Sequence, residues 1–118
     1  MLKTILSAAT AAMTVPLFPA PTYHAPPCAV YRYYPAGSDG AKRTATFTVR
    51  VFASTVTEAA EELSRLRRAL VSDGDLGLIG DADNLLLVRE TSEGATSGYV
   101  RGAQVYFIQA GFTISGRA

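Results

Sequence analysis

The chain has 118 residues, and its 11 basic and 10 acidic side chains give a formal net charge of +1. Hydrophobic residues make up 48% of it and charged residues 18%, which is typical of a globular domain. The chain is long enough for one such domain and too short for two. The balanced charge excludes the strongly basic surface of nucleic-acid and anionic-membrane binders, so we expect no specific nucleic-acid partner and no membrane partner. One cysteine and one histidine exclude an internal disulfide framework and the usual four-ligand zinc site.

The first 20 residues have the outline of a secretory signal, because Lys3 is followed by a mildly apolar stretch of small residues. At helical spacing, however, the apolar side chains fall on one face and the polar ones on the other. The apolar face consists of Leu2, Ile5, Leu6, Ala9, Ala12 and Met13. A secretory core is apolar all round, so we interpret residues 2–14 as an amphipathic helix packed on the domain and ended by Pro16. A signal peptide over residues 1–20 is the alternative.

The next segments predict an extended connector followed by a β-hairpin. Five prolines make residues 15–27 a strap that cannot be helical and is a poor central strand. Residues 29–34 (AVYRYY) are rich in β-formers, and residues 35–41 (PAGSDGA) carry turn chemistry. Residues 44–52 (TATFTVRVF) alternate between apolar and polar side chains, which indicates the second strand of the hairpin.

A second helix is predicted from about residue 55 to residue 72. Thr55 and Glu58 have the spacing of a capping box, in which both side chains satisfy backbone donors. The expected core stripe is Val56, Ala59, Ala60, Leu63, Leu66 and Leu70, and the expected wet face is Glu58, Glu61, Glu62, Arg65 and Arg68. On that face, Glu61 and Arg65 have the spacing of a favourable ion pair.

The remaining residues predict two more strands. Residues 73–84 (DGDLGLIGDADN) are rich in glycine and aspartate and are interpreted as a solvated loop. Residues 85–90 (LLLVRE) predict a short strand, and residues 91–98 a flexible turn. Residues 99–115 then predict one long strand or two, with Gly111 as a candidate β-bulge.

These elements predict one domain over residues 1–118 of the α+β class. We expect an antiparallel, roughly four-stranded sheet with an N-terminal helix (residues 1–14) and one central helix packed on it, joined by the Pro-rich strap. The sheet and the central helix occupy residues 28–118.

Both faces of the predicted strands carry large apolar side chains. In the first strand, Tyr31 and Tyr33 oppose Val30 and Tyr34. We therefore expect the two helices to cover one face and a second copy of the chain to cover the other. Helices on opposite faces, or tyrosines that are only half-buried, are the alternatives.

Neither of the candidate reactive clusters has the pattern that its chemistry requires. Cys28 and His24 have the residue types of a nucleophile and a base, but no third group to orient them, and Pro26 and Pro27 exclude a helix there. The aspartates of residues 73–84 fail the calcium-loop template, because its glycine and final glutamate positions hold other residues. We therefore predict no enzyme, with no catalytic, cofactor-binding or metal-binding residues.

Several segments in order resemble one known family. They are a short N-terminal helix (residues 2–14), a proline-rich approach to a tyrosine-rich strand (PPCAVYRYY), a glycine and aspartate turn (residues 37–40), an alternating strand (residues 44–52), a helix (residues 59–70) and a closing strand pair that ends in QAGFTISG. This arrangement is similar to the tail terminator proteins of long-tailed bacteriophages, also called tail completion or minor capsid-like proteins.

The resemblance implies a structural virion protein made in the host cytoplasm. Members of that family form a hexameric ring on the head-proximal end of the tail tube, end tube polymerisation and join the head connector. The expected partners are thus other copies of the chain, the tail tube protein and the connector or stopper protein, with no cofactor. The alternatives are another head–tail junction protein, such as a neck or stopper protein, and an exported binding module if residues 1–20 are a signal peptide. Contacts are expected in polar turns, at Asp39, Lys42, Arg43, Glu93, Tyr99 and Arg101.

Overall fold

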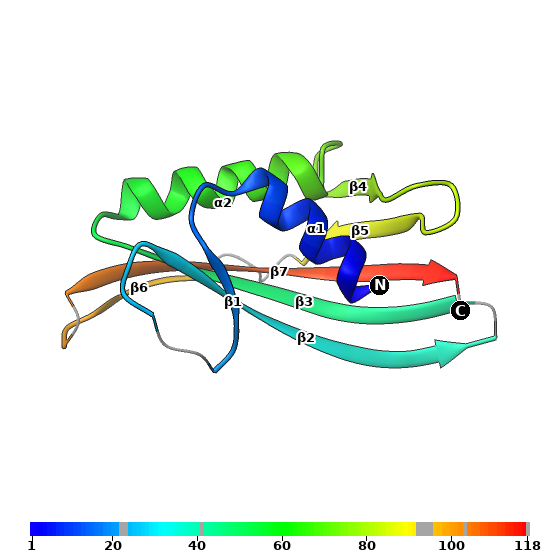
Figure 1. Ribbon diagram of the computed structural model, residues 1–118, viewed down its shortest axis with the longest axis horizontal. Helices are drawn as coiled ribbons and strands as arrows, with labels where there is room; N and C mark the ends of the chain where they lie inside the picture. The colour runs from blue at the N-terminus through cyan, green and yellow to red at the C-terminus, as the bar shows by residue number, and fades with distance from the viewer. Residues whose placement is uncertain (22–23, 41, 92–95, 103, 118) are drawn as a thin grey trace.

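The computed structural model describes residues 1–21, 24–40, 42–91, 96–102 and 104–117. Within these residues, two helices and seven strands follow one another (Figure 1). They are α1 (Leu2–Ala12), β1 (Leu17–Pro19), β2 (Cys28–Asp39), β3 (Lys42–Ala53), α2 (Val56–Leu70), β4 (Leu76–Ile79), β5 (Leu86–Glu90), β6 (Thr96–Val100) and β7 (Val105–Arg117).

All seven strands belong to one mixed sheet with the order β1-β2-β3-β7-β5-β4, and β6 also pairs with β7. Strand β1 runs parallel to β2, whereas the other pairs are antiparallel. Strands β5 and β6 share one edge of β7, where β5 pairs with residues 112–115 and β6 with residues 105–109. The prediction of an α+β fold with an antiparallel, roughly four-stranded sheet is therefore wrong, because the protein is mostly β with a seven-stranded mixed sheet.

Three short strands lie where the sequence predicts connectors. Strand β1 lies within the proline-rich strap. Hydrogen bonds join its two flanks to β2: the Ala29 N–H donates to the Pro16 carbonyl (2.8 Å), and the Ala20 N–H donates to the Tyr31 carbonyl (2.9 Å). Strand β4 lies inside the glycine and aspartate segment, and β6 inside and just beyond the predicted turn at residues 91–98. Strands this short form because a neighbouring edge offers hydrogen-bond partners, which local composition does not reveal.

The β2–β3 hairpin is longer than predicted. Strand β2 continues through Pro35 to Asp39, and β3 begins at Lys42, so the turn comes between these two residues. A register shift between Pro35 and Gly37 accommodates the proline, which has no N–H for the ladder. Gly37, with a φ of 112°, adopts a conformation that favours glycine.

The prediction of a β-bulge at Gly111 is wrong. Gly111 pairs with Thr48 in an unbroken ladder between β3 and β7. On the other edge of β7, β5 ends at Glu90 and β6 begins at Thr96. At this break, Thr91 donates its N–H and its hydroxyl to the Gly111 carbonyl, at 2.9 and 3.2 Å. Strand β7 therefore runs through Gly111 without a break in its pairing with β3.

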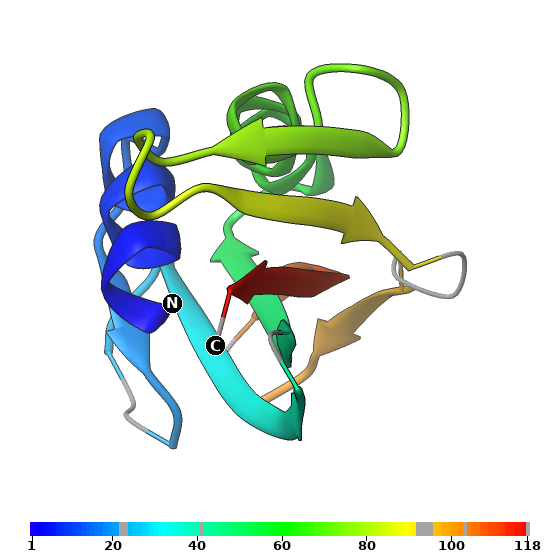
Figure 2. The same cartoon turned by 90° about the vertical axis from the view of Figure 1, so that its right-hand side faces the viewer.

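Both helices lie on the same side of β2, β3 and β7 (Figure 1). Helix α1 confirms the predicted N-terminal helix but ends two residues earlier, at Ala12. Helix α2 begins at the predicted cap, where the Thr55 hydroxyl accepts a 3.2 Å hydrogen bond from the Glu58 N–H. Figure 2 shows that the sheet curls and brings β4 next to α2. The largest fully buried side chains between helices and sheet are Phe47, Phe112, Ile5, Leu63, Leu66, Leu70, Ile114, Val49, Val51 and Val88.

One carboxylate of α2 lies in the core, although the sequence places it on the wet face. Glu62 is 5% exposed and accepts hydrogen bonds from both the N–H (3.0 Å) and the hydroxyl of Thr14. Arg65 lies 3.8 Å from the Glu62 carboxylate, in place of the predicted Glu61–Arg65 pair. Glu62 thereby ties the end of α1 to α2.

The opposite face of the sheet carries no helix in the described residues, and most of it is polar. Along β3 this face presents Thr44, Thr46, Thr48 and Arg50, before the half-buried Phe52. The expectation of apolar side chains on both faces holds at one end of the sheet, where Val30 of β2, Phe52 of β3 and Phe107 of β7 share the helix-free face. Tyr31 and Tyr33 are half-buried and pack against the core on the helix side. The apolar surface that a second copy of the chain could cover is therefore smaller than the side-chain pattern of β2 indicates.

Candidate functional site

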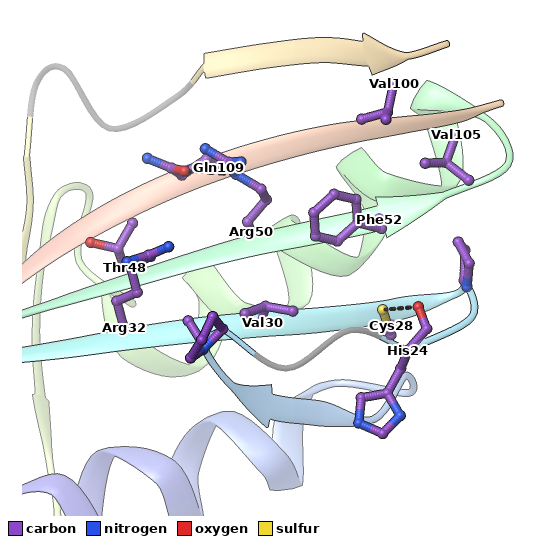
Figure 3. Close-up of a pocket in the computed structure, with 13 residues that line it drawn as sticks. His24, Cys28, Val30, Arg32, Thr48, Arg50, Phe52, Val100, Val105 and Gln109 are labelled. Atoms are coloured by element: carbon purple, nitrogen blue, oxygen red, sulfur yellow. Dashed lines mark hydrogen bonds between the residues drawn. The ribbon is translucent and has the colours of Figure 1, made fainter. Parts of the chain in front are cut away.

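A hollow of about 250 Å³ lies on the helix-free face, between the strap and the first half of β2 (Figure 3). Strands β2, β3 and β7 supply its floor, and the strap and β6 supply walls. The residues that line it are Ala20, Pro21, His24, Pro26, Cys28, Val30, Arg32, Thr48, Arg50, Phe52, Val100, Val105 and Gln109.

Two arginines reach this hollow from neighbouring strands. The hairpin register pairs Val30 with Arg50 and Arg32 with Thr48, so the two arginines are diagonal neighbours on one face. The Arg50 Nε donates to the Gln109 Oε1 at 2.9 Å. The same guanidinium lies over the Phe107 ring, 4.6 Å from its centroid. Together these contacts hold the Arg50 guanidinium in a defined position.

In the part of the chain that the structure describes, neither arginine forms an ion pair with a carboxylate. The ion pairs there join Arg65 to Glu62 and Arg67 to Glu90. Arg32 donates from Nη1 to the Tyr34 hydroxyl at 3.2 Å, which leaves its charge uncompensated. Two arginines that line one hollow and have no carboxylate partner among the described residues favour an incoming anion, because guanidinium binds carboxylate and phosphate oxygens.

The thiol and the imidazole in this hollow do not form a catalytic pair. The Cys28 thiol points to the His24 carbonyl, 3.7 Å away, while the His24 ring stacks on Phe18 with centroids 3.5 Å apart (Figure 3). Burial raises the pKa of the Cys28 thiol, because the thiolate would lose its hydration. This environment favours a neutral, packed thiol over a nucleophile.

The aspartate-rich segment also has a structural use. Asp81 accepts the N–H groups of Asp83 (3.0 Å) and Asn84 (2.9 Å) through Oδ1, which shapes the loop between β4 and β5. Among the described residues, no three His, Cys, Asp or Glu side chains gather as metal ligands would. No helix in the described chain has the length and hydropathy that crossing a membrane requires.

An exposed apolar cluster lies on the β4–β5 hairpin. Leu78 pairs with Leu87 across the two strands, and Leu85 precedes β5. Their side chains are between 42% and 62% exposed, whereas Leu86 between them is buried in the core. We call Leu78, Leu85 and Leu87 the leucine patch.

A different apolar cluster lies at the other end of the molecule. Tyr99 and Tyr106 pair across β6 and β7, with ring centroids 4.8 Å apart. Tyr99 is 48% and Tyr106 39% exposed, and we call these two residues the tyrosine patch. Val100 pairs with Val105 and lies on the other face of the sheet, at the same end of the molecule. The molecule measures 46 × 26 × 24 Å. Figure 1 shows the β6–β7 end and the loop between β4 and β5 at opposite ends of its long axis.

The predicted contact residues divide between these two ends. Asp39 and Lys42 pair across the β2–β3 hairpin, and the Arg43 Nε donates to the Arg117 carbonyl at 3.0 Å, so all three belong to strands rather than to a loop. Lys42 and Arg43 line a shallow hollow that includes the leucine patch. Tyr99 belongs to the tyrosine patch, and the exposed Arg101 follows β6. Glu93 lies outside the described residues.

The arginine-lined hollow is missing from the sequence prediction. The alternation of residues 44–52 places Arg50 on the polar face of its strand, and Arg32 has the same position in β2. Their proximity depends on the hairpin register, which the length of the turn sets. Because the predicted turn at residues 35–41 is too long, it does not give the observed register. The leucine patch is missing for a related reason, since β4 is predicted as loop.

The described residues thus form a small, mostly β protein with a mixed sheet, two helices on one face, and exposed apolar and cationic surfaces. A scan against known protein families finds no match for the chain. A search of curated proteins also finds none.

Proposed function

We propose that this protein is a tail terminator of a long-tailed bacteriophage. It forms a ring with copies of itself, caps the head-proximal end of the tail tube, ends tube polymerisation and joins the head connector. The observation that carries this proposal is the pair of unlike apolar patches at opposite ends of an elongated subunit.

Unlike patches favour a head-to-tail contact. A two-fold contact joins a patch to its own copy and stops at a dimer, whereas a contact between different patches repeats from subunit to subunit. Such a series closes into a ring when its rotation permits, and a closed ring leaves no patch free to recruit more subunits. A subunit of this kind suits a cap, because its assembly stops by itself.

The family resemblance supports the same function from the sequence. The tyrosine-rich segment, the alternating segment and the closing QAGFTISG segment form β2, β3 and β7, which are neighbours at the centre of the sheet. Central strands determine the shape of a subunit more than its turns do, so a resemblance that includes all three of them favours a common architecture.

The test is a tube-capping assay. Tail tube protein from the same phage genome is allowed to polymerise with and without the purified protein, and tube ends and lengths are measured by negative-stain electron microscopy. We expect shorter tubes with a ring at one end. Tubes that elongate equally in its presence would overturn the proposal. Binding to the isolated head connector without any effect on tubes would identify a neck or stopper protein instead.

A matched pair of variants tests the role of the leucine patch in this assay. Leu87→Glu places a charge in the patch, and we expect it to abolish capping because the contact would have to bury that charge. Ala60→Glu places the same charge on an exposed position of α2 outside the leucine patch, and should cap like the unmodified protein. Equal capping by both variants would exclude the leucine patch from ring formation.

A further inference from the structure

We infer that the arginine-lined hollow binds the loop between β4 and β5 (residues 80–85) of a second copy of the chain. This inference rests on the proposed ring and identifies its head-to-tail contact. Arg32 and Arg50 receive a carboxylate of the incoming loop, and the apolar walls of the hollow receive its neighbours.

Charge complementarity supports this assignment. The hollow has two arginines that pair with no carboxylate among the described residues, whereas the loop carries Asp81 and Asp83. Asp81 is occupied in shaping the loop, but the carboxylate of the exposed Asp83 takes part in no hydrogen bond of the described chain. Lys42, Arg43 and Arg117 line the same shallow hollow as Asp83, but none of them forms an ion pair with Asp83 in the described chain. Asp83 is therefore free to reach an arginine of another subunit.

The size of the hollow favours side chains over a small-molecule ligand. Its volume of about 250 Å³ is below the usual range for drug-sized ligands, roughly 300–1,000 Å³, and is sufficient for one or two side chains. Val30, Phe52 and Val105 give it apolar walls. The loop offers a matching sequence, since Asp83 is flanked by Ala82 and is followed closely by Leu85.

The positions of loop and hollow suit a head-to-tail contact. The loop adjoins the leucine patch at one end of the long axis, and the hollow opens near the other end (Figures 1 and 3). Val100 lines the hollow and directly follows Tyr99 of the tyrosine patch in β6, so the hollow and the patch lie on opposite faces of the same end of the sheet. A loop seated in the hollow therefore brings the leucine patch of one copy to the tyrosine-patch end of the next, and the contact repeats.

Sedimentation velocity over a range of protein concentrations tests the contact. We expect the unmodified protein to self-associate, more strongly at low salt because the contact pairs opposite charges. Arg50→Glu and Asp83→Arg should each weaken self-association about tenfold or more, because each places like charges against each other. The matched controls are Arg68→Glu and Asp75→Arg, which reverse charges on exposed residues of α2 and of the turn before β4 and should associate normally.

Mixing the two variants provides a test that misfolding does not mimic. The intact loop of Arg50→Glu fits the intact hollow of Asp83→Arg, so two proteins that are monomeric alone should associate when mixed. The altered surfaces are also complementary, since the hollow of Arg50→Glu carries an added negative charge and the loop of Asp83→Arg an added positive charge. Failure of the mixture to associate, when both variants show the circular dichroism spectrum of the unmodified protein, would overturn the inference.

The other outcomes separate this inference from the proposed function. Unmodified protein that stays monomeric at its highest soluble concentration overturns the inference, while the tube-capping assay still decides the function. Association that survives both charge reversals but not Leu87→Glu also overturns it and leaves the ring in place. Association lost with Arg50→Glu but kept with Asp83→Arg shows that another acidic segment occupies the hollow.

Discussion

At the scale of single residues, the buried Glu62 carboxylate is the polar link between the two helices. It accepts the Thr14 N–H and hydroxyl just beyond α1 and lies next to Arg65. Removing it leaves the Thr14 donors without this partner in a partly buried place, which costs about 1–3 kcal/mol. We expect Glu62→Ala to lower the free energy of unfolding by that amount in urea titrations. Glu61→Ala, at the exposed preceding position, should change it by less than about 0.5 kcal/mol, and equal losses would contradict the role of Glu62.

The buried Cys28 thiol predicts a dependence of stability on pH. Burial raises the pKa of Cys28 in the folded protein, while the unfolded chain keeps the ordinary thiol pKa. As the pH rises through the unfolded pKa, the unfolded state loses its proton first, so the folded state loses relative stability.

The prediction is that the unmodified protein loses more stability than Cys28→Ala between about pH 8 and pH 10. Urea titrations of both proteins across this pH interval measure the difference between their free energies of unfolding. Both proteins contain the same tyrosines, so the contribution of tyrosine titration cancels in this difference. Parallel pH profiles would show that Cys28 keeps its ordinary pKa in the folded state.

At the scale of elements, β4 depends on a close approach to the end of α2. A β-carbon on Gly77 would lie 2.8 Å from the carbonyl carbon of Leu70 and 2.9 Å from the Cα of Val71, and closer still to the Leu70 oxygen. Gly77→Ala should therefore push β4 from α2 and lower the free energy of unfolding by about 1–3 kcal/mol, measured by thermal or urea unfolding. Gly102→Ala, where a β-carbon would meet no described atom within 4 Å, should be nearly neutral. A neutral Gly77→Ala would show that β4 is not held against the helix.

Individual elements differ in how far their sequence predicts them. The amphipathic pattern of residues 2–14, the Thr55 cap and the alternation of residues 44–52 are local, and α1, α2 and β3 follow them closely. The strands β1, β4 and β6 have no such pattern, because each has only three to five residues and is stabilised by a neighbouring edge. The candidate hollow likewise has no local pattern, since it combines side chains from four strands and the strap.

At the scale of the whole molecule, one core includes residues of both helices and of the sheet. Ile5 and Ala9 of α1, Leu63 of α2, and Phe47 and Phe112 of the sheet belong to the same buried cluster. We therefore expect one cooperative unfolding transition, with far-UV circular dichroism and tyrosine near-UV signals that coincide in urea. Helix signal lost at lower urea than the tyrosine signal would show that α1 unfolds separately.

The sequence by itself determined where the two helices and the main alternating strand lie, because helix and strand periodicities are properties of consecutive residues. Only the tertiary structure decided the seven-stranded mixed sheet, the burial of Glu62 and the juxtaposition of Arg32 with Arg50. These features depend on strand register and on which edge meets which, and both are set by contacts between residues far apart in the chain.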